Sequence, residues 1–193
     1  MKPIFLMRGA PQIEIVGEFL TASECLSIIR CASARMQPSP VMASGGNAFE
    51  DSRTSTGMFF ERGELPLIAE LEQRLSNYFH FPIENGEGLQ VLRYTAGQQY
   101  KAHHDHFDAT TFSGEQALQR GGQRVATVLM YLNTPTGGVT DFPDAGATVY
   151  ANEGVAVCFR YEEGQPRKSL HAGTPVEDGE KWVATKWVRK GRF

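Results

Sequence analysis

Hydrophobic and polar positions divide the chain into two parts, and the first part is mainly helical. Apolar and polar residues alternate over residues 11–17, which predicts a first strand. A capping box at Thr21 and Glu24 then begins a helix, whose apolar residues follow at helical spacing until Pro38. A second apolar stripe predicts a helix over residues 65–79.

The second part, from about residue 85, consists of short strands separated by glycine and proline clusters. The predicted strands cover residues 89–94, 99–106, 124–132, 148–150, 154–159, 169–172 and 182–188. Many short strands after two helices indicate a closed or double-sheet β architecture. We therefore expect a mainly β fold with supporting helices (α+β). Its core would be a double-stranded β-helix, or jelly roll, over about residues 85–190, with the two N-terminal helices of residues 1–80 packed on it.

Between the two helices, residues 37–56 are rich in proline, serine, glycine and asparagine. This composition predicts a mobile loop. The loop ends with Arg53, Thr54 and Ser55, just before a further predicted strand over residues 57–60.

Composition indicates a single globular domain that spans residues 1–193. The chain has 193 residues, of which 41% are hydrophobic and 21% charged, so it can form a full core and is too apolar for disorder. A formal net charge of −3 gives no basic surface, and we expect no nucleic-acid partner. Because no apolar run approaches the roughly 20 residues of a membrane helix, we expect no membrane association. Arg8 interrupts the short apolar patch at residues 1–9 and no small-residue cleavage site follows, so we expect no secretion signal.

The three cysteines, Cys25, Cys31 and Cys158, are too few and too scattered for a disulfide framework. We expect them to be reduced, buried thiols. Thiols of this kind are typical of a cytoplasmic protein.

Candidate metal ligands are concentrated in one short segment of the β part. His103, His104, Asp105 and His106 follow one another, and His171 lies far downstream. In a strand, the first and third of the four would share one face, and the second and fourth the other. Together with His171, His103 and Asp105 would form the two-histidine, one-carboxylate set of non-haem Fe(II) oxygenases. His104 and His106 would instead form a zinc-like set of three nitrogens with His171. Periodicity alone does not choose between them, and an exposed strand edge that carries histidines for solubility is a third interpretation.

A second candidate group lies on the last predicted strand. If residues 182–188 are extended, Lys181, Val183, Thr185 and Trp187 project to one face. A lysine among inward-facing apolar residues needs an anionic partner, because an unpaired buried charge is costly. The alternative is an amine that reaches solvent at the mouth of the strand.

The chain also resembles a known family in several runs that occur in a fixed order. Leu89–Asp105 (LQVLRYTAGQQYKAHHD) and Ser169–Trp187 (SLHAGTPVEDGEKWVATKW) are similar to the two halves of the signature of prolyl 4-hydroxylase-type dioxygenases, which depend on 2-oxoglutarate and Fe(II). Arg124–Asn133 and Gly137–Pro143 match between them. The resemblance covers about residues 50–190, and its specificity comes from the order and spacing of the motifs.

This resemblance implies a particular set of metal ligands. His103, Asp105 and His171 would bind Fe(II), which resolves the strand register that periodicity leaves open. His104 stands where an aromatic residue is common in the family, and His106 follows one step beyond the motif. Both would point away from the metal.

For the cosubstrate and the substrate, the resemblance implies five further residues. Lys181 would pair with the distal carboxylate of 2-oxoglutarate, Tyr94 would donate its hydroxyl to the same group, and Thr127 would line the pocket. Arg53 stands where such enzymes carry a flexible loop that closes over a peptide, and Trp187 would border the substrate.

The implied enzyme is a 2-oxoglutarate-dependent dioxygenase, similar to procollagen-proline 4-dioxygenase. It would use Fe(II), 2-oxoglutarate and O2, with ascorbate as reductant, to hydroxylate a prolyl residue of a peptide or protein at its 4-position, with release of succinate and CO2. One alternative is the same chemistry on a free amino acid or another side chain. Others are a cupin-like domain that binds a metal or a small acid without turnover, and a zinc hydrolase built on His104 and His106.

Overall fold

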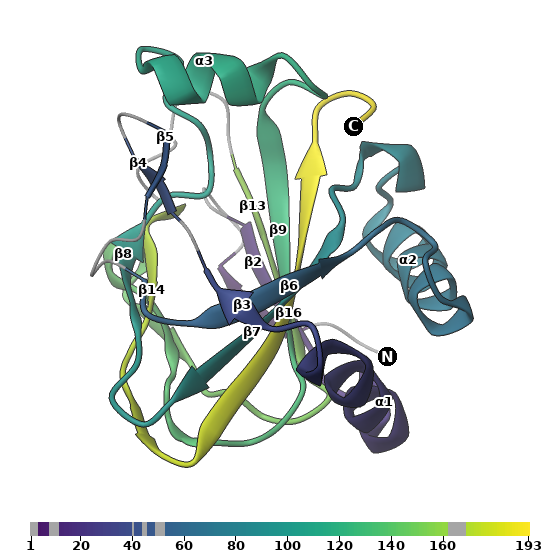
Figure 1. Ribbon diagram of the computed structural model, residues 1–193, viewed down its shortest axis with the longest axis vertical. Coiled ribbons are helices and arrows are strands. Elements are labelled where there is room, and N and C mark those ends of the chain that lie inside the picture. The colour runs from purple at the N-terminus through teal and green to yellow at the C-terminus, as the bar shows by residue number, and fades with distance from the viewer. Residues whose placement is uncertain (1–3, 8–11, 40, 44–45, 49–52, 162–168) are drawn as a thin grey trace.

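Two antiparallel β-sheets lie face to face, and helices cover the outer face of the larger sheet (Figure 1). The computed structural model describes residues 4–7, 12–39, 41–43, 46–48, 53–161 and 169–193. In spatial order, the larger sheet contains β1 (Ile4–Met7), β2 (Gln12–Val16), β13 (Ala156–Arg160), β9 (Arg124–Tyr131), β16 (Glu180–Arg189), β7 (Leu89–Thr95), β6 (Thr56–Phe60) and β3 (Gln37–Pro38). The smaller sheet contains β12 (Ala147–Val149), β11 (Thr140–Phe142), β14 (His171–Gly173) and β8 (Tyr100–His103).

The remaining elements are short strand pairs and helices. Two separate pairs join β10 (Thr136–Gly137) to β15 (Val176–Asp178) and β4 (Val41–Ala43) to β5 (Gly46–Ala48). The α-helices are α1 (Ala22–Ser33), α2 (Pro66–Phe79) and α3 (Phe112–Leu118), and single 3-10 turns cover Ile83–Asn85 and Pro143–Ala145. None of the described helices is both long and apolar enough to cross a bilayer.

Local sequence signals account for the starts of the two long helices. In α1, Glu24 N donates to Thr21 Oγ1 at 3.2 Å and Thr21 N donates to Glu24 Oε2 at 2.8 Å, so the predicted capping box is confirmed. α2 begins with Pro66 in its first turn. The predicted end of the first helix was wrong, because α1 already stops at Ser33, well before Pro38.

Apolar side chains form two layers on either side of the larger sheet. The outer layer packs α1 and α2 against the sheet, and its buried helix residues are Cys25, Ile28, Ala32, Ile68, Leu71, Leu75 and Phe79. The inner layer fills the space between the two sheets, and it includes Leu92, Tyr131, Phe142, Val149, Val157, Phe159 and Val183. This arrangement confirms the predicted fold class, a mainly β fold with supporting helices.

Several elements were absent from the prediction because they are too short to produce a clear period. β1, β10, β11 and β15 have two to four residues each. The two-turn helix α3 begins at Thr111, whose hydroxyl accepts from Gly114 N at 3.1 Å. The predicted loop over residues 37–56 contains β3, β4 and β5, and part of it (residues 40, 44–45 and 49–52) lies outside the described residues.

The prediction for the cysteines was correct in two of the three cases. All three are free thiols, and Cys25 and Cys158 are buried. Cys31 is exposed on α1, because it lies to one side of the buried stripe of Cys25, Ile28 and Ala32.

A buried ion pair links α2 to the outer face of the larger sheet. Lys186 Nζ on β16 lies 2.5 Å from Glu72 Oε1 on α2, and the two residues are 5% and 3% exposed. The second carboxylate oxygen of Glu72 accepts from Gly63 N at 2.9 Å. Each charged group therefore depends on the other for its solvation.

Replacement of Glu72 by alanine should destabilise the fold by about 3–5 kcal/mol, because it leaves the ammonium group of Lys186 buried without a counter-ion. Urea unfolding measures the effect, with Glu70→Ala on the exposed side of α2 as the control. A double change of Glu72 and Lys186 to methionine should recover most of the loss. A Glu72→Ala protein with wild-type stability would contradict this account of the pair.

Candidate active site

The candidate metal ligands meet where β8 pairs with β14. His103 and His171 are direct partners in this antiparallel pairing, although they are remote in sequence. β8 ends at His103, so the strand predicted over 99–106 was too long, and Asp105 lies in the bend that follows. Arg124 Nη1 donates to the carbonyl oxygen of Asp105 at 3.2 Å and holds this bend in place.

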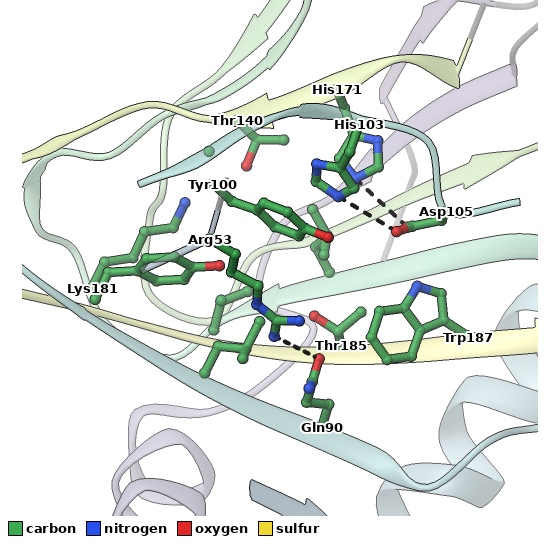
Figure 2. Close-up of a pocket in the computed structure, with 15 residues that line it drawn as sticks. Arg53, Gln90, Tyr100, His103, Asp105, Thr140, His171, Lys181, Thr185 and Trp187 are labelled. Atoms are coloured by element: carbon green, nitrogen blue, oxygen red, sulfur yellow. Dashed lines mark hydrogen bonds and ion pairs between the residues drawn. The ribbon is translucent and has the colours of Figure 1, made fainter. Parts of the chain in front are cut away.

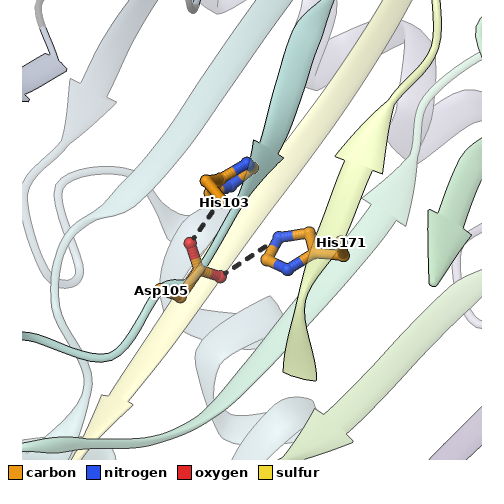
Figure 3. Close-up of side chains that lie close together, drawn as sticks. All are labelled: His103, Asp105 and His171. Atoms are coloured by element: carbon orange, nitrogen blue, oxygen red, sulfur yellow. Dashed lines mark ion pairs between the residues drawn. The ribbon is translucent and has the colours of Figure 1, made fainter. Parts of the chain in front are cut away.

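Three potential ligand atoms from His103, Asp105 and His171 all lie within 4.8 Å of one another. Nε2 of His103 lies 3.5 Å from Asp105 Oδ1, and Nε2 of His171 lies 3.6 Å from Asp105 Oδ2 (Figure 3). The other ring nitrogens contact backbone carbonyls, His103 Nδ1 that of Lys101 at 2.8 Å and His171 Nδ1 that of Ser169 at 3.0 Å.

These contacts determine which nitrogen of each imidazole carries the proton. A carbonyl oxygen only accepts, so Nδ1 carries a proton, and in the neutral form of each ring, the form that binds a metal, Nε2 carries a lone pair. Two lone pairs and a carboxylate thus converge on one small volume, where they would repel each other without a cation. Backbone carbonyls that orient imidazoles in this way are typical of metal-binding histidines.

Ionisation of the three groups also suits a metal. Burial alone would raise the pKa of Asp105, but His171, His103 and Arg124 together hold it well below its usual value. Burial and the nearby His103 lower the pKa of His171 to about 4. At neutral pH the carboxylate is therefore charged and His171 is neutral, the forms in which both groups bind metals.

The alternative zinc-like set is not formed by the described residues. The rings of His104 and His106 lie beside each other with centroids 4.9 Å apart, and both are partly buried. Neither belongs to the group of converging ligand atoms that contains His171.

A cavity beside the metal ligands has an empty volume of about 480 Å³, part of it open to solvent. Most of the candidate residues from the sequence line it. They are Tyr94 and, labelled in Figure 2, Arg53, His103, Asp105, His171, Lys181 and Trp187. Val183 and Thr185, which lie between Lys181 and Trp187 along β16, also line the cavity, as the alternation of side chains predicts.

Lys181 brings a positive charge into this cavity without a counter-ion among the residues that the structure describes. It is 5% exposed, and no described carboxylate lies within ion-pair distance of its amine. Its Nζ faces the rings of Tyr94 and Tyr131, at 5.9 Å and 5.6 Å from their centroids. Gly138 makes room for the lysine stem, since a Cβ at this position would lie 3.2 Å from Lys181 Cδ.

Burial lowers the pKa of Lys181 to about 8. The amine is still mostly charged at neutral pH. An unpaired ammonium group of this kind in a cavity favours an anionic ligand.

Arg53 lies inside the cavity instead of on an exposed loop. Its Nε donates to Ser55 Oγ at 3.2 Å, and its Nη2 donates to Gln90 Oε1 at 3.1 Å. The guanidinium carbon lies 5.1 Å from the ring centroid of Tyr100. The sequence reasoning missed Gln90, although it shares a strand face with Tyr94 and the alternation along β7 could have identified it.

The sequence reasoning also missed Tyr100, whose ring stacks on that of His103 with centroids 3.5 Å apart. Trp187 lies under the guanidinium of Arg124, which is 3.9 Å from its ring centroid. The indole nitrogen of Trp187 is buried and has no hydrogen-bond partner among the described residues.

The structure places Thr127 away from the position that the resemblance implies. Its hydroxyl donates to Asp105 Oδ2 at 2.7 Å, and it is not among the residues that line the cavity. In this structure Thr127 is therefore a hydrogen-bond partner of the Asp105 carboxylate.

A two-histidine, one-carboxylate cluster inside a double-sheet β fold defines the class of non-haem, metal-dependent oxygenases. Residues 89–189 match the model of the 2OG-Fe(II) oxygenase superfamily, and the chain belongs to this superfamily. It is accordingly a 2-oxoglutarate-dependent dioxygenase that uses Fe(II), and the predicted family and enzyme class are confirmed.

Curated relatives and solved structures agree with this assignment. The chain is 42% identical to prolyl 4-hydroxylase 1 of Arabidopsis thaliana over 203 residues, which cover 94% of this chain and 70% of the relative. It is 38% identical to prolyl 4-hydroxylase 2 of the same plant over 210 residues, which cover 95% and 69%. Its fold is similar to that of a viral collagen prolyl hydroxylase from Paramecium bursaria Chlorella virus-1, solved as a 2OG complex. The TM-score is 0.71 and the identity 29%, with 92% of this chain and 95% of that chain covered.

Proposed function

We propose that this protein hydroxylates prolyl residues of a peptide or protein at the 4-position, with release of succinate and CO2. The observation that carries the proposal is the convergence of the two Nε2 atoms and the Asp105 carboxylate beside a cavity that holds Lys181, which pairs with no carboxylate of the described residues. The names of the relatives, prolyl 4-hydroxylases and a collagen prolyl hydroxylase, support the substrate class.

In this proposal the converging ligands, His103, Asp105 and His171, hold Fe(II). Bound together with 2-oxoglutarate and O2, the metal supplies the oxidation of an unactivated C–H bond. Lys181 binds the distal carboxylate of 2-oxoglutarate, and Tyr94 beside it donates its hydroxyl to the same group. These contacts orient the cosubstrate, and the burial of its binding site excludes water from it.

Arg53 and Trp187 border the substrate in the same proposal. Trp187 offers an aromatic face for a pyrrolidine ring. Arg53 is held in place by Ser55 and Gln90, so its remaining guanidinium donors have a fixed direction.

An oxygenation assay tests the proposal directly. Purified protein with Fe(II), 2-oxoglutarate and a proline-rich peptide should produce succinate and add one oxygen atom to the peptide. A matched peptide in which alanine replaces proline should gain no oxygen. Oxygen transfer to free proline alone would instead favour the amino-acid alternative, and cosubstrate binding without any succinate would favour the non-catalytic one.

Three further features belong to the same proposal. Ascorbate serves as the reductant, so its omission should lower the number of turnovers that each enzyme molecule completes. Residues 1–193 act as one domain. The protein works in the cytoplasm, which the free, buried thiols of Cys25 and Cys158 support.

A further inference from the structure

Tyr161 is a polar residue at the metal cluster to which neither the sequence motifs nor the proposed chemistry gives a role. It directly follows β13, and its backbone N–H donates to the carbonyl of Val125 at 2.9 Å. Its ring packs edge-on against Phe159, with centroids 5.8 Å apart. These contacts fix the direction of the side chain, and its hydroxyl lies 3.2 Å from Asp105 Oδ2.

Two hydroxyl groups share this one carboxylate oxygen. Thr127 Oγ1 donates to Asp105 Oδ2 at 2.7 Å, and the hydroxyls of Thr127 and Tyr161 also lie in direct contact with each other. Each hydroxyl has one proton to donate. Three oxygens therefore share two hydroxyl protons, and Asp105 Oδ2 is the one that carries negative charge and only accepts.

The other oxygen of Asp105 has a different environment. Among the described residues, its near neighbour is Nε2 of His103 at 3.5 Å, which presents a lone pair in the neutral form that binds a metal. The two oxygens are thus distinguished by their partners. Rotation of the carboxylate about its Cβ–Cγ bond away from this orientation would break the hydroxyl contacts.

We propose that Tyr161, together with Thr127, is a positioning residue that fixes the orientation of the Asp105 carboxylate for metal binding. The inference rests on the proposed metal-binding role of Asp105. It adds a residue outside the signature motifs, whose hydroxyl acts through Asp105 and touches neither cosubstrate nor substrate.

Metal affinity of the metal-free protein tests this role without any turnover. Mn(II) is titrated in the absence of 2-oxoglutarate, and the free ion is measured by electron paramagnetic resonance. Tyr161→Phe, which removes only the hydroxyl, should bind Mn(II) about 10–100-fold more weakly than the wild type. The matched control is Tyr131→Phe, a buried tyrosine of the same core layer whose hydroxyl donates to Thr140 at 2.7 Å and does not touch Asp105. It should stay within about twofold of the wild type.

A spectroscopic readout separates positioning from a general loss of packing. The visible spectrum of the Co(II) form depends on ligand geometry, so it should change in Tyr161→Phe and not in Tyr131→Phe. Wild-type Mn(II) affinity and an unchanged Co(II) spectrum in Tyr161→Phe would overturn the inference. A wild-type protein that binds no divalent metal would overturn the proposed function as well.

Thr127 offers a second test if Tyr161→Phe does not fold. Thr127→Val removes the neighbouring hydroxyl and Thr127→Ser retains it. The inference expects Thr127→Val to bind Mn(II) about 10–100-fold more weakly than Thr127→Ser. Equal affinities would mean that the hydroxyl pair does not orient Asp105.

Discussion

Asp105→Ala should have no measurable dioxygenase activity and should bind Mn(II) more than about 100-fold more weakly than the wild type, since loss of a mere partner of a ligand already costs about 10–100-fold. Asp105 supplies the anionic member of the cluster, and its carboxylate is the group that both Nε2 atoms face. Without it, two neutral imidazoles remain, which cannot compensate the charge of a divalent cation in a buried site.

Asp108→Ala is the matched control for this change. Asp108 lies three residues further along the same segment, is exposed, and uses Oδ1 to accept from Thr110 N at 2.9 Å. Its replacement should leave metal affinity unchanged. A combined His104→Ala and His106→Ala variant should also bind the metal normally, because neither residue belongs to the cluster. Loss of metal binding in that variant, with retention in Asp105→Ala, would favour the zinc-like alternative.

Lys181→Met should raise the KM for 2-oxoglutarate by about 10–150-fold, the equivalent of about 1.5–3 kcal/mol for a hydrogen bond to a charged group. Methionine has a similar length and no charge, so the cavity keeps its shape. Mn(II) affinity should not change, because Lys181 takes no part in the metal cluster. Thermal stability should not fall either, since the change removes a buried cation that has no counter-ion in the described part of the chain.

The pH dependence of cosubstrate binding gives a second test of Lys181. Its pKa in the free enzyme is lowered to about 8 by burial, so the amine is charged below that pH and neutral above it. A bound carboxylate stabilises the charged form and raises the pKa again. The KM for 2-oxoglutarate should therefore stay flat below about pH 8 and rise up to about tenfold per pH unit above it. Lys181→Met should lack this rise, and a wild-type KM that is flat to high pH would contradict the role of the lysine.

Alternation along strands identified much of the candidate site in advance. Lys181 and Trp187 share a face of β16 with Thr185, and all three line the cavity. His103 and Asp105 were expected to point the same way because both were placed in one strand. They do lie together in the structure, but β8 ends at His103 and Asp105 is not part of the strand. Asp105 turns inward through the bend that Arg124 stabilises, and such a contact between remote residues leaves no period in the sequence.

Side chains that act through tertiary contacts were not predicted. Gln90 accepts a hydrogen bond from Arg53, and Tyr100 stacks on His103. Tyr161, just after β13, contacts Asp105. Thr127 was expected to line the pocket, and it contacts Asp105 instead. Each of these roles depends on which residues of another strand lie opposite, and this is decided by how the two sheets pack.

By itself, the sequence determined the succession of helices and strands, the fold class and the residue types available for metal and acid binding, because capping boxes and periodic burial are local properties of the chain. Only the tertiary structure decided that His171 pairs with His103, which nitrogen of each ring carries the proton, and that Lys181 has no counter-ion among the described residues. These features arise from strand register and burial, which bring together segments that are far apart in sequence.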